Sequence, residues 1–436
     1  METIKRIYEA FCRGGRITTD SRDIQAGDIF IALKGESHDG NTFAEKAIAS
    51  GAAYAIVDEA EHADGTRRLL VPDGLQFLQQ LARHHRRQLK IPILGITGTN
   101  GKTTTKELCH AVLSKKYRTT ATKGNLNNHI GVPLTLLSMT AETQFGIVEM
   151  GANHPGEIQT LCDIAEPDYG IITNIGSAHL EGFGNQENIV RTKRALYEAV
   201  NARHGTLFVN GRDALLTAQT AKLHPRLQAR IVTYGTDSCF ANGKIAQSVP
   251  FLVFTLKTSK GHLYVRTKLI GGYNFDNAMA ATAVGLYFDI DPLDIQAAIE
   301  GYSPSNMRSQ LLKTTRNTVI LDAYNANPSS MAVAIENFGE IRHPRKIIIA
   351  GEMRELGADT ANAHRKVLEQ IKRLAIPQTF TVGKAFKAVA EDFPGVTRFE
   401  DTDALVCFLK QHPVSDAFLL VKGSRGNKLE QIIEYL

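Results

Sequence analysis

Residues 95–105 form the feature that constrains the fold most. Their sequence, GITGTNGKTTT, follows the apolar run of residues 91–94 and opens a helical pattern, so a strand, a glycine loop and a helix start come in succession. Glycines let consecutive backbone N–H groups turn toward an anion, and the N-terminal end of the helix adds a partial positive charge. Lys102 can then reach the β- and γ-phosphate oxygens of a nucleotide, and the Thr103 hydroxyl can hold Mg²⁺. We therefore predict that the chain binds ATP or GTP.

The loop differs from the general phosphate-loop pattern at one position. Ile96 stands where that pattern has its first glycine, and Gly95 comes one residue early. The alternative is an ordinary glycine turn with an incidental lysine. The occurrence of strand, Gly-Lys-Thr and helix in this order favours nucleotide binding.

Length and charge limit the class of protein. At 436 residues the chain predicts two or three domains, because a single core rarely grows that large. The net charge is +5, from 50 basic and 45 acidic residues, and this field is too weak to indicate a nucleic-acid partner. A basic cluster at residues 83–87 lies in a helical pattern, and we interpret it as a solvated face.

Cysteines and apolar runs indicate the compartment. Five cysteines are scattered without paired spacing, and an odd number argues against a disulfide framework. The first residues lack the pattern of a signal sequence, and no apolar run approaches the roughly 20 residues that span a bilayer. We expect a cytoplasmic protein with no segment inserted in a membrane.

The spacing of apolar residues predicts an α/β protein with three domains, at residues 1–85, 86–305 and 306–436. The first has short strands at residues 29–33 and 53–57 with a helix between them, which indicates a small α/β domain. In the second and third domains, strands alternate with helical patterns, which is typical of mainly parallel sheets covered by helices. We expect the third domain to be Rossmann-like. A hairpin within residues 251–265 is expected to form a side sheet on the central domain.

Two polar residues follow apolar strands of the central domain. In an open α/β sheet, ligands sit at the carboxyl ends of the strands. Glu149 ends the strand of residues 145–148, and its carboxylate suits Mg²⁺, which joins protein oxygens to substrate phosphates. His179 lies just beyond the strand of residues 169–172, and it is a candidate ligand or catalytic group, although a lone histidine is often structural.

In their order along the chain, these segments resemble the Mur ligase family, which builds the peptide of bacterial cell-wall precursors. The resemblance is carried by residues 97–104, 149–151 and 177–181, and by Lys193 with residues 196–197. Residues 322–328, DAYNANP, resemble the signature of the member that adds D-alanyl-D-alanine. The further segments that agree with that member are residues 19–22, 27–35, 125–133 and 422–425.

The resemblance implies an ATP-dependent acid–D-amino-acid ligase with an N-terminal domain for the uridine substrate, a central ATPase domain and a C-terminal ligase domain. Such an enzyme joins D-alanyl-D-alanine to UDP-N-acetylmuramoyl-tripeptide through an acyl phosphate, in the last cytoplasmic step toward the peptidoglycan pentapeptide precursor. ATP and Mg²⁺ are then the cofactors, the partners are small molecules, and we expect a monomer. The third residue of the stem peptide stays open between lysine and diaminopimelate.

The resemblance also implies where the nucleotide binds. Asn277 would lie near the adenine, although the usual His-Asn pair is Tyr273-Asn274 here, which leaves Tyr273 without an assigned role. The residues implied in nucleotide binding are Thr97, Gly98, Thr99, Asn100, Gly101, Lys102, Thr103, Thr104, Asn277, Arg308, Asp322, Tyr324 and Asn325.

The third domain would complete the nucleotide site by closing over it. Arg308 would reach the γ-phosphate with a permanently charged planar group, and the alternative is a surface arginine in a linker. Asp322, Tyr324 and Asn325 would contact the ribose and base. A plain helix cap is the alternative explanation for Asn327, which follows them.

The metal ligands implied by the resemblance are Thr103, Glu149, His179 and Lys193. Lys193 would carry a carbamate that helps to hold a second Mg²⁺, whereas the pattern alone predicts a solvated helix lysine. Carbamylation requires an amine that is partly neutral and shielded. Catalytic roles fall to Lys102, Glu149, His179, Lys193 and Arg308.

The substrate contacts implied by the resemblance are Ser21, Arg22, Asn125, Asn127 and Asn128. Arginine is suited to diphosphate oxygens, so Ser21 and Arg22 would hold the uridine diphosphate. The alternative is a turn with an exposed arginine.

Three other functions remain open. The first is a related ligase that adds a single amino acid, or a folylpolyglutamate-type enzyme, although the chain lacks the Asp-Asn-Pro-Arg run expected of the diaminopimelate-adding relative. The second is a kinase or phosphate-loop switch protein, which would need no amine acceptor. The third is a binding-only relative, against which the intact set of implied catalytic residues argues.

Overall fold

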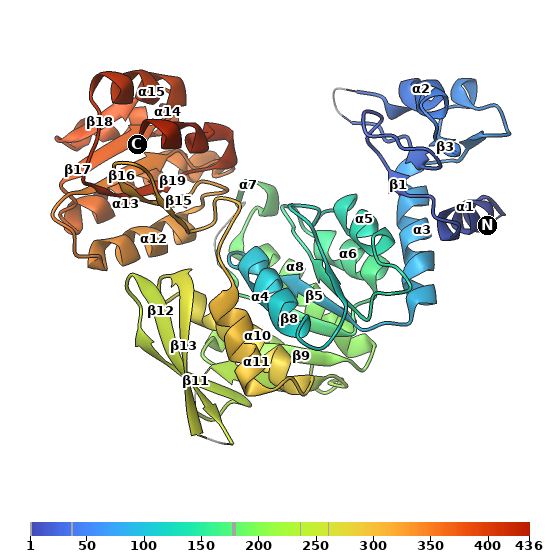
Figure 1. Ribbon diagram of the computed structural model, residues 1–436, viewed down its shortest axis with the longest axis horizontal. Helices are drawn as coiled ribbons and strands as arrows, with labels where there is room; N and C mark the ends of the chain where they lie inside the picture. Colours follow the sequence, from blue (N-terminus) through green and yellow to red (C-terminus); the bar gives the residue numbers. More distant parts are fainter. Residues whose placement is uncertain (1, 36–37, 177–179, 236, 260) are drawn as a thin grey trace.

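The structure is a computed structural model that describes residues 2–35, 38–176, 180–235, 237–259 and 261–436. The chain forms three α/β units, each built on its own sheet, and Figure 1 shows the central unit between the other two. The predicted fold class is confirmed. Among the described residues, no helix combines the length and apolar character needed to cross a bilayer.

The N-terminal unit is a four-stranded parallel sheet in the order β1-β2-β3-β4. Its strands are β1 (Ile17–Thr18), β2 (Ile29–Ile31), β3 (Tyr54–Val57) and β4 (Arg68–Leu70), and its helices are α1 (Glu2–Cys12), α2 (Ala44–Ala49) and α3 (Gly74–Leu89). The two strands and the helix expected here are β2, β3 and α2. Helix α3 runs through the expected boundary at residue 85, so that boundary stays a prediction.

The central unit is a nine-stranded sheet in the order β13-β12-β11-β10-β9-β8-β5-β7-β6. Its strands are β5 (Ile93–Thr97), β6 (Thr119–Ala121), β7 (Phe145–Glu149), β8 (Tyr169–Ile172), β9 (Thr206–Asn210), β10 (Arg230–Gly235), β11 (Ala241–Gln247), β12 (Phe251–Thr258) and β13 (Gly261–Ile270). Pairing is parallel from β6 to β11, and β12 and β13 form the expected antiparallel hairpin. The expected side sheet is instead an extension of the main sheet, because β11, which the sequence did not reveal, pairs with both β10 and β12.

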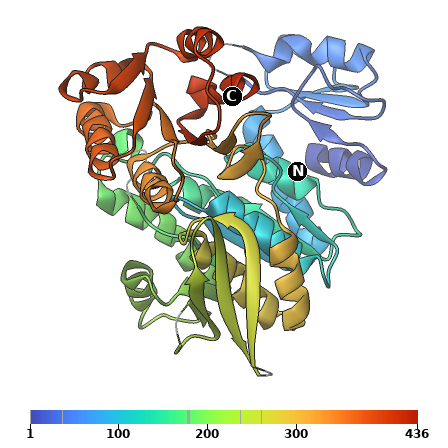
Figure 2. The ribbon, with the colours of Figure 1, turned by 60° about the vertical axis from the view of Figure 1, so that its left-hand side comes forward.

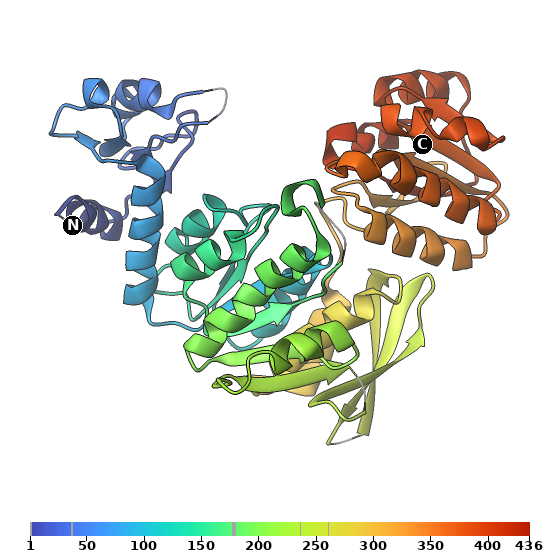
Figure 3. The same ribbon diagram turned by 180° about the vertical axis from the view of Figure 1, so that it is seen from behind.

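Helices cover both faces of the central sheet. They are α4 (Lys102–Leu113), α5 (Gly131–Leu137), α6 (Glu157–Ala165), α7 (Leu180–Phe183), α8 (Gln186–Ala202), α9 (Ala214–Ala221), α10 (Asn274–Tyr287) and α11 (Pro292–Gly301). Figure 1 shows α4, α10 and α11 on one face, and Figure 3 shows α8 on the other. Strands β5, β7 and β9 are therefore buried along their whole length, as expected of parallel strands between two helical layers.

The C-terminal unit is a six-stranded sheet in the order β14-β15-β19-β16-β17-β18, parallel except for β14 at its edge. Its strands are β14 (Gln310–Lys313), β15 (Thr318–Asp322), β16 (Lys346–Gly351), β17 (Gln378–Val382), β18 (Val396–Phe399) and β19 (Phe418–Lys422). Its helices are α12 (Pro328–Glu340), α13 (Thr360–Arg373), α14 (Lys384–Lys387) and α15 (Thr402–Gln411). Short 3₁₀ helices along the chain lie at Gly40–Phe43, Ala60–His62, Gly357–Asp359, Ala390–Asp392, Arg425–Asn427 and Leu429–Tyr435.

Apolar contacts hold the C-terminal unit beside the central one. Ile270 at the end of β13 belongs to the same buried cluster as Met331 and Ile335 of α12, and Phe251 of β12 packs against that cluster. Figure 2 shows this end of the hairpin beneath the C-terminal unit. The contact fixes α12 near the carboxyl ends of the central strands.

The basic cluster at residues 83–87 is a correction to the sequence interpretation, because part of it is buried. Arg86 is 5% exposed, and its guanidinium donates to the carbonyls of Ala165 (2.9 Å) and Glu166 (3.0 Å) and to the carboxylate of Asp168 (2.7 Å). Burial lowers the pKa of Arg86, while Asp168 opposes that shift. The pattern predicted a solvated face because residues 165–168 lie far away in sequence. The cluster instead ties α3 to the central unit.

Replacement of Arg86 by alanine is expected to lower the free energy of unfolding by about 3 kcal/mol, because it leaves buried carbonyls and a carboxylate without their donor. The matched control is Arg83→Ala, whose half-exposed side chain pairs with Glu166 and whose loss should cost no more than about 1 kcal/mol. Equilibrium urea denaturation measures both. Equal losses in the two variants would contradict a buried structural role for Arg86.

Candidate functional site

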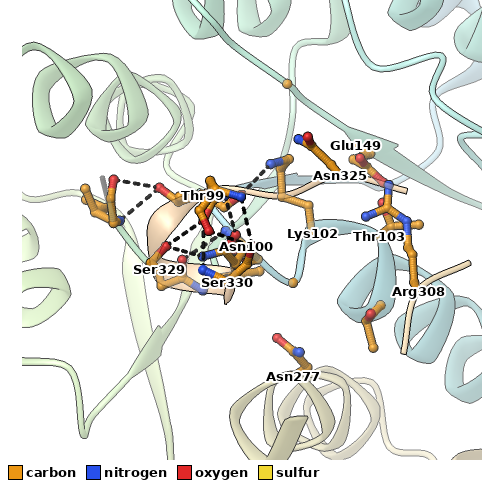
Figure 4. Close-up of a pocket in the computed structure, with 18 of the residues that line it drawn as sticks. Thr99, Asn100, Lys102, Thr103, Glu149, Asn277, Arg308, Asn325, Ser329 and Ser330 are labelled. Atoms are coloured by element: carbon orange, nitrogen blue, oxygen red, sulfur yellow. Dashed lines mark hydrogen bonds between the residues drawn. The ribbon is translucent and has the colours of Figure 1, made fainter. Parts of the chain in front are cut away.

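A cavity of about 1360 Å³ lies at the carboxyl ends of the central strands, between the central and C-terminal units. The glycine loop, the ends of β7 and β8, the start of α10 and the start of α12 all contribute to its lining. Figure 4 shows Lys102, Thr103, Glu149 and Arg308 around it. The cavity is where ligands of an open α/β sheet are expected.

The glycine loop has the predicted form, with β5 before it and α4 beginning at Lys102. Gly101 has a φ of 80°, and an added Cβ would lie 2.5 Å from Oδ1 of Asn277, so only glycine fits between the loop and α10. The Lys102 ammonium folds back and donates to the carbonyls of Gly98 (2.7 Å) and Thr99 (3.0 Å). Burial lowers the pKa of Lys102 to about 8, Glu149 opposes the shift and Arg308 adds to it. An incoming phosphate would offer this ammonium a better partner than the loop carbonyls.

Two residues of the implied nucleotide set lie behind the loop rather than in the cavity wall. The Thr97 hydroxyl is buried and donates to the carbonyl of Met150 (2.8 Å). Gly98 likewise is absent from the described lining of the cavity, and its carbonyl accepts a hydrogen bond from Lys102. The residues from Thr99 to Thr104 line the cavity directly.

Glu149 offers an oxygen to the cavity. Register places Glu149 at the end of β7 opposite Ile96 of β5, beside the loop. Its Oε1 accepts a hydrogen bond from Asn127 (2.8 Å), while its buried Oε2 has no hydrogen-bond partner among the described residues. A buried carboxylate oxygen without a partner is costly unless a cation or donor meets it. Glu149 therefore fits the role of a metal ligand.

Lys193 is buried in α8, at 4% exposure, so the solvated lysine expected from the pattern alone is wrong. Burial lowers its pKa to about 7, and the nearby charge of Lys102 adds to the shift. In a large fraction of the protein molecules, the Lys193 side chain is consequently a neutral amine at neutral pH. This is the physical condition that carbamylation requires.

Arg308 reaches the cavity from the linker that precedes β14. Its guanidinium lies 3.9 Å from the centre of the Tyr324 ring, and its buried Nε has no hydrogen-bond partner among the described residues. The linker is bent at Asn306, Met307 and Ser309, which have φ values of 57°, 57° and 47°. Residues without glycine's freedom adopt such angles where the surrounding structure holds them. The guanidinium therefore faces the same cavity as Lys102, rather than open solvent.

Contacts across the cavity join the loop to the start of α12. The side-chain amide of Asn100 makes both contacts. Its Nδ2 donates to the Ser329 hydroxyl (2.8 Å), and its Oδ1 accepts a hydrogen bond from Nδ2 of Asn327 (2.9 Å). Asn327 also caps α12 with a capping box and Pro328 in the first turn, so the helix-cap explanation of this residue is correct. Ser329 was missed by sequence reasoning, since no local pattern predicts a contact with a loop more than two hundred residues away.

The remaining nucleotide candidates also lie at the cavity. Asn277 is buried in α10, where it accepts from the Thr105 hydroxyl (3.1 Å). Asp322 accepts from the Lys422 ammonium (2.7 Å), a buried pair that sequence reasoning did not anticipate. Tyr324 and Asn325 follow β15 and line the cavity.

The implied substrate residues fall in two places. Asn125, Asn127 and Asn128 line the cavity. Ser21 and Arg22 lie in the N-terminal unit, outside the described lining, where the exposed Arg22 pairs with Asp20 (2.7 Å). The prediction for His179 falls outside the described residues.

Comparisons with known proteins cover nearly the whole chain. Residues 15–86 match the model "Mur ligase family, catalytic domain", residues 96–285 the "Mur ligase middle domain" and residues 307–425 the "Mur ligase, glutamate ligase domain". The UDP-N-acetylmuramoyl-tripeptide–D-alanyl-D-alanine ligase of Bacillus subtilis is 34% identical over 96% of this chain and 92% of its own. The Escherichia coli ligase of the same name is 32% identical over 96% of this chain and 93% of its own. A crystal structure of MurF from Acinetobacter baumannii superposes with a TM-score of 0.88 at 30% identity, covering 99% of this chain and 97% of the other.

Proposed function

The chain belongs to the Mur ligase family, and from this premise we propose that it joins D-alanyl-D-alanine to UDP-N-acetylmuramoyl-tripeptide at the expense of ATP. The product is the peptidoglycan pentapeptide precursor. One observation carries the proposal: Lys102 of the central unit and Arg308 beside the C-terminal unit face one cavity, in a chain that matches ligases of this name along its full length.

The chemistry begins with activation of a carboxylate, which does not accept amines unaided. A carboxylate oxygen of the tripeptide attacks the γ-phosphorus of ATP, the bond from that phosphorus to ADP breaks, and an acyl phosphate forms. Lys102 and Arg308 stabilise the charge that spreads over the transferring phosphoryl group. Their fixed positions therefore supply the electrostatic part of catalysis.

The second step forms the amide. The neutral amine of D-alanyl-D-alanine attacks the acyl carbon and gives a tetrahedral intermediate. That intermediate loses a proton from nitrogen and expels phosphate, so the C–N bond forms as the C–O bond to phosphate breaks. Asn125, Asn127 and Asn128 are proposed to hold the tripeptide substrate where they line the cavity.

Mg²⁺ is the proposed metal cofactor, and Thr103 and Glu149 would hold it. The unpartnered Oε2 of Glu149 supports the assignment. When bound, Mg²⁺ neutralises phosphate charge. We propose a carbamate on Lys193 as the ligand of a second ion, a role that its burial and lowered pKa support. His179 stays a prediction from the family resemblance.

Three further proposals complete the assignment. The uridine diphosphate is placed on the N-terminal unit at Ser21 and Arg22. The domain boundaries are placed at residues 85 and 305. A cytoplasmic monomer is proposed because the reaction consumes ATP and soluble nucleotide-linked precursors.

The test is ADP release by the purified chain with UDP-N-acetylmuramoyl-tripeptide, measured with and without D-alanyl-D-alanine. We expect ADP release only when the tripeptide substrate and D-alanyl-D-alanine are both present. The tripeptide substrate that supports release has lysine or diaminopimelate as its third residue, or either of them. Release that demands a free amino acid instead would identify a ligase that adds a single residue. Release without any amine acceptor would indicate a kinase or a nucleotide switch.

A further inference from the structure

Tyr273 has no role assigned by the sequence, and the structure gives its hydroxyl a partner. The residue lies shortly after β13, at the N-cap of α10, and it lines the large cavity described above, of about 1360 Å³. The hydroxyls of Tyr273 and Ser309 lie 2.9 Å apart and share a hydrogen bond. Ser309 directly follows Arg308 in the linker to the C-terminal unit. A side chain of the central unit is therefore bonded to the neighbour of the arginine that faces Lys102.

The backbone before α10 fixes the direction of the Tyr273 ring. Gly271 has a φ of 86°, and a Cβ added there would lie 2.3 Å from Cε1 of Tyr273, so the ring lies in the space that glycine leaves. Burial raises the pKa of the Tyr273 hydroxyl, and the charge of Asp322 adds to the shift. The hydroxyl consequently stays protonated at neutral pH and can donate to Oγ of Ser309.

The hydrogen bonds continue from Ser309 into the C-terminal unit. The Ser309 N–H donates to Oδ1 of Asp322 (3.2 Å), and Oδ2 of Asp322 accepts from the Lys422 ammonium (2.7 Å). Asp322 ends β15 and Lys422 ends β19, and the two strands are neighbours in the sheet. The linker at Ser309 is therefore held from both units, by a hydroxyl at the start of α10 and by a carboxylate at the end of β15.

The linker depends on such contacts because its backbone adopts an unfavourable conformation. Ser309 has a φ of 47°, and Met307, on the other side of Arg308, has a φ of 57°. Residues other than glycine rarely keep such angles unless neighbouring contacts hold them. The buried Nε of Arg308 has no hydrogen-bond partner among the described residues, so the direction of the guanidinium depends on this backbone and on the Tyr324 ring beside it.

Helix α10 relates Arg308 to the phosphate loop. Asn277 lies about one turn after Tyr273 on this helix. Its side chain lies against the loop, where a Cβ added to Gly101 would come within 2.5 Å of Oδ1 of Asn277. The same helix therefore contacts the loop that carries Lys102 and the linker that carries Arg308.

We propose that Tyr273 is a positioning residue for phosphoryl transfer, because its hydrogen bond to Ser309 holds Arg308 in a fixed place relative to Lys102. The inference rests on the proposed function, in which these two cations stabilise the transferring phosphoryl group. In this role Tyr273 acts through Arg308 and not by contact with the reacting atoms. Developing charge is best stabilised by groups that are already in place, so a guanidinium that can move stabilises the transition state less at the same affinity for ATP.

The test is ADP release by Tyr273→Phe, which loses the hydroxyl and keeps the ring. We expect kcat to fall by about 5- to 10-fold, the upper range for one lost hydrogen bond between neutral groups, with KM for ATP and for the uridine substrate within about twofold of the wild type. Ser309→Ala should lower kcat by the same factor. The double variant Tyr273→Phe/Ser309→Ala should fall no further, because both changes remove one shared contact.

The control is Tyr264→Phe, the same chemical change on β13. Tyr264 is 53% exposed and lies outside the described wall of the large cavity. This variant should keep the turnover of the wild type. Thermal unfolding of all the variants checks that the fold is intact.

The Arg308→Ala background separates positioning from general support of the fold. Without the guanidinium there is nothing to position, so Tyr273→Phe should leave the already lowered kcat of Arg308→Ala unchanged. A purely structural role for Tyr273 would lower kcat by the same factor in both backgrounds, and a direct contact of Tyr273 with the nucleotide would raise KM for ATP in both.

Either of those results overturns the positioning role while the proposed function stands. Full turnover by Tyr273→Phe, or by Arg308→Ala, overturns it as well. If the wild-type chain releases no ADP with its three substrates, the proposed function fails, and this inference fails with it.

Discussion

Replacement of Lys102 by alanine is expected to lower kcat for ADP release by about 10³-fold. The ammonium lies in the loop at the start of α4, faces the large cavity and is half-buried. Its removal takes away a fixed positive charge at the γ-phosphoryl group, where charge develops during transfer. The measurement is the steady-state rate of ADP release with all three substrates at saturating concentration.

The control for Lys102 is Lys115→Ala, which removes an exposed lysine just beyond the end of the same helix. Its turnover should stay close to that of the wild type. Thermal unfolding of both variants checks that the loop change leaves the fold intact. A Lys102→Ala variant with turnover within threefold of the wild type would refute the assignment of the phosphoryl-transfer site to this loop.

Replacement of Lys193 by alanine is expected to lower kcat by about 10²- to 10³-fold, with partial recovery on addition of acetate or formate. If Lys193 carries a carbamate, its loss removes an anion, and a small carboxylate can enter the space left by the shortened side chain. ADP release with and without the added acid measures the recovery. Arg191→Ala, an exposed change on the same helix, should neither lose activity nor respond to the acid.

The pKa of Lys193 gives this prediction a pH dependence with a definite sign. Only the neutral amine takes up CO₂, and burial lowers the pKa to about 7. Below pH 7 the neutral fraction falls roughly tenfold per unit, so stimulation of the wild-type chain by added bicarbonate should rise from pH 6 to pH 8 and then level off. Bicarbonate dependence that falls over this range, or no recovery of Lys193→Ala by any short acid, would exclude the carbamate.

Local sequence was sufficient for the features that depend on neighbouring residues. The strand, loop and helix around residues 95–105 were predictable because a glycine turn that precedes a helix is set within about ten residues. The ends of β7 and β8 were predictable for the same reason, since apolar runs of the right length end in polar residues. The general rule for ligands at an open sheet predicted that Glu149 lies at the ligand-binding edge, and the structure added the pairing of β5 with β7 that places it beside the loop.

Local sequence was insufficient wherever burial depends on distant segments. Lys193 and Arg86 both lie in helices with charged neighbours, and both patterns indicated solvent. In the structure Arg86 meets residues 165–168, and Lys193 is buried in α8, where the charge of Lys102 still acts on it. Strand β11 was missed because it is only partly buried and lacks a continuous apolar run.

The sequence by itself determined the class of fold, the phosphate loop and the family, because these depend on residue types at short spacings and on their order along the chain. Only the tertiary structure decided which charged groups lose their water, that Arg308 shares a cavity with Lys102, and that the hydroxyls of Tyr273 and Ser309 meet beside it. The physical reason is that desolvation and convergence arise from contacts between segments that are far apart in the sequence, and no local pattern encodes which faces will meet.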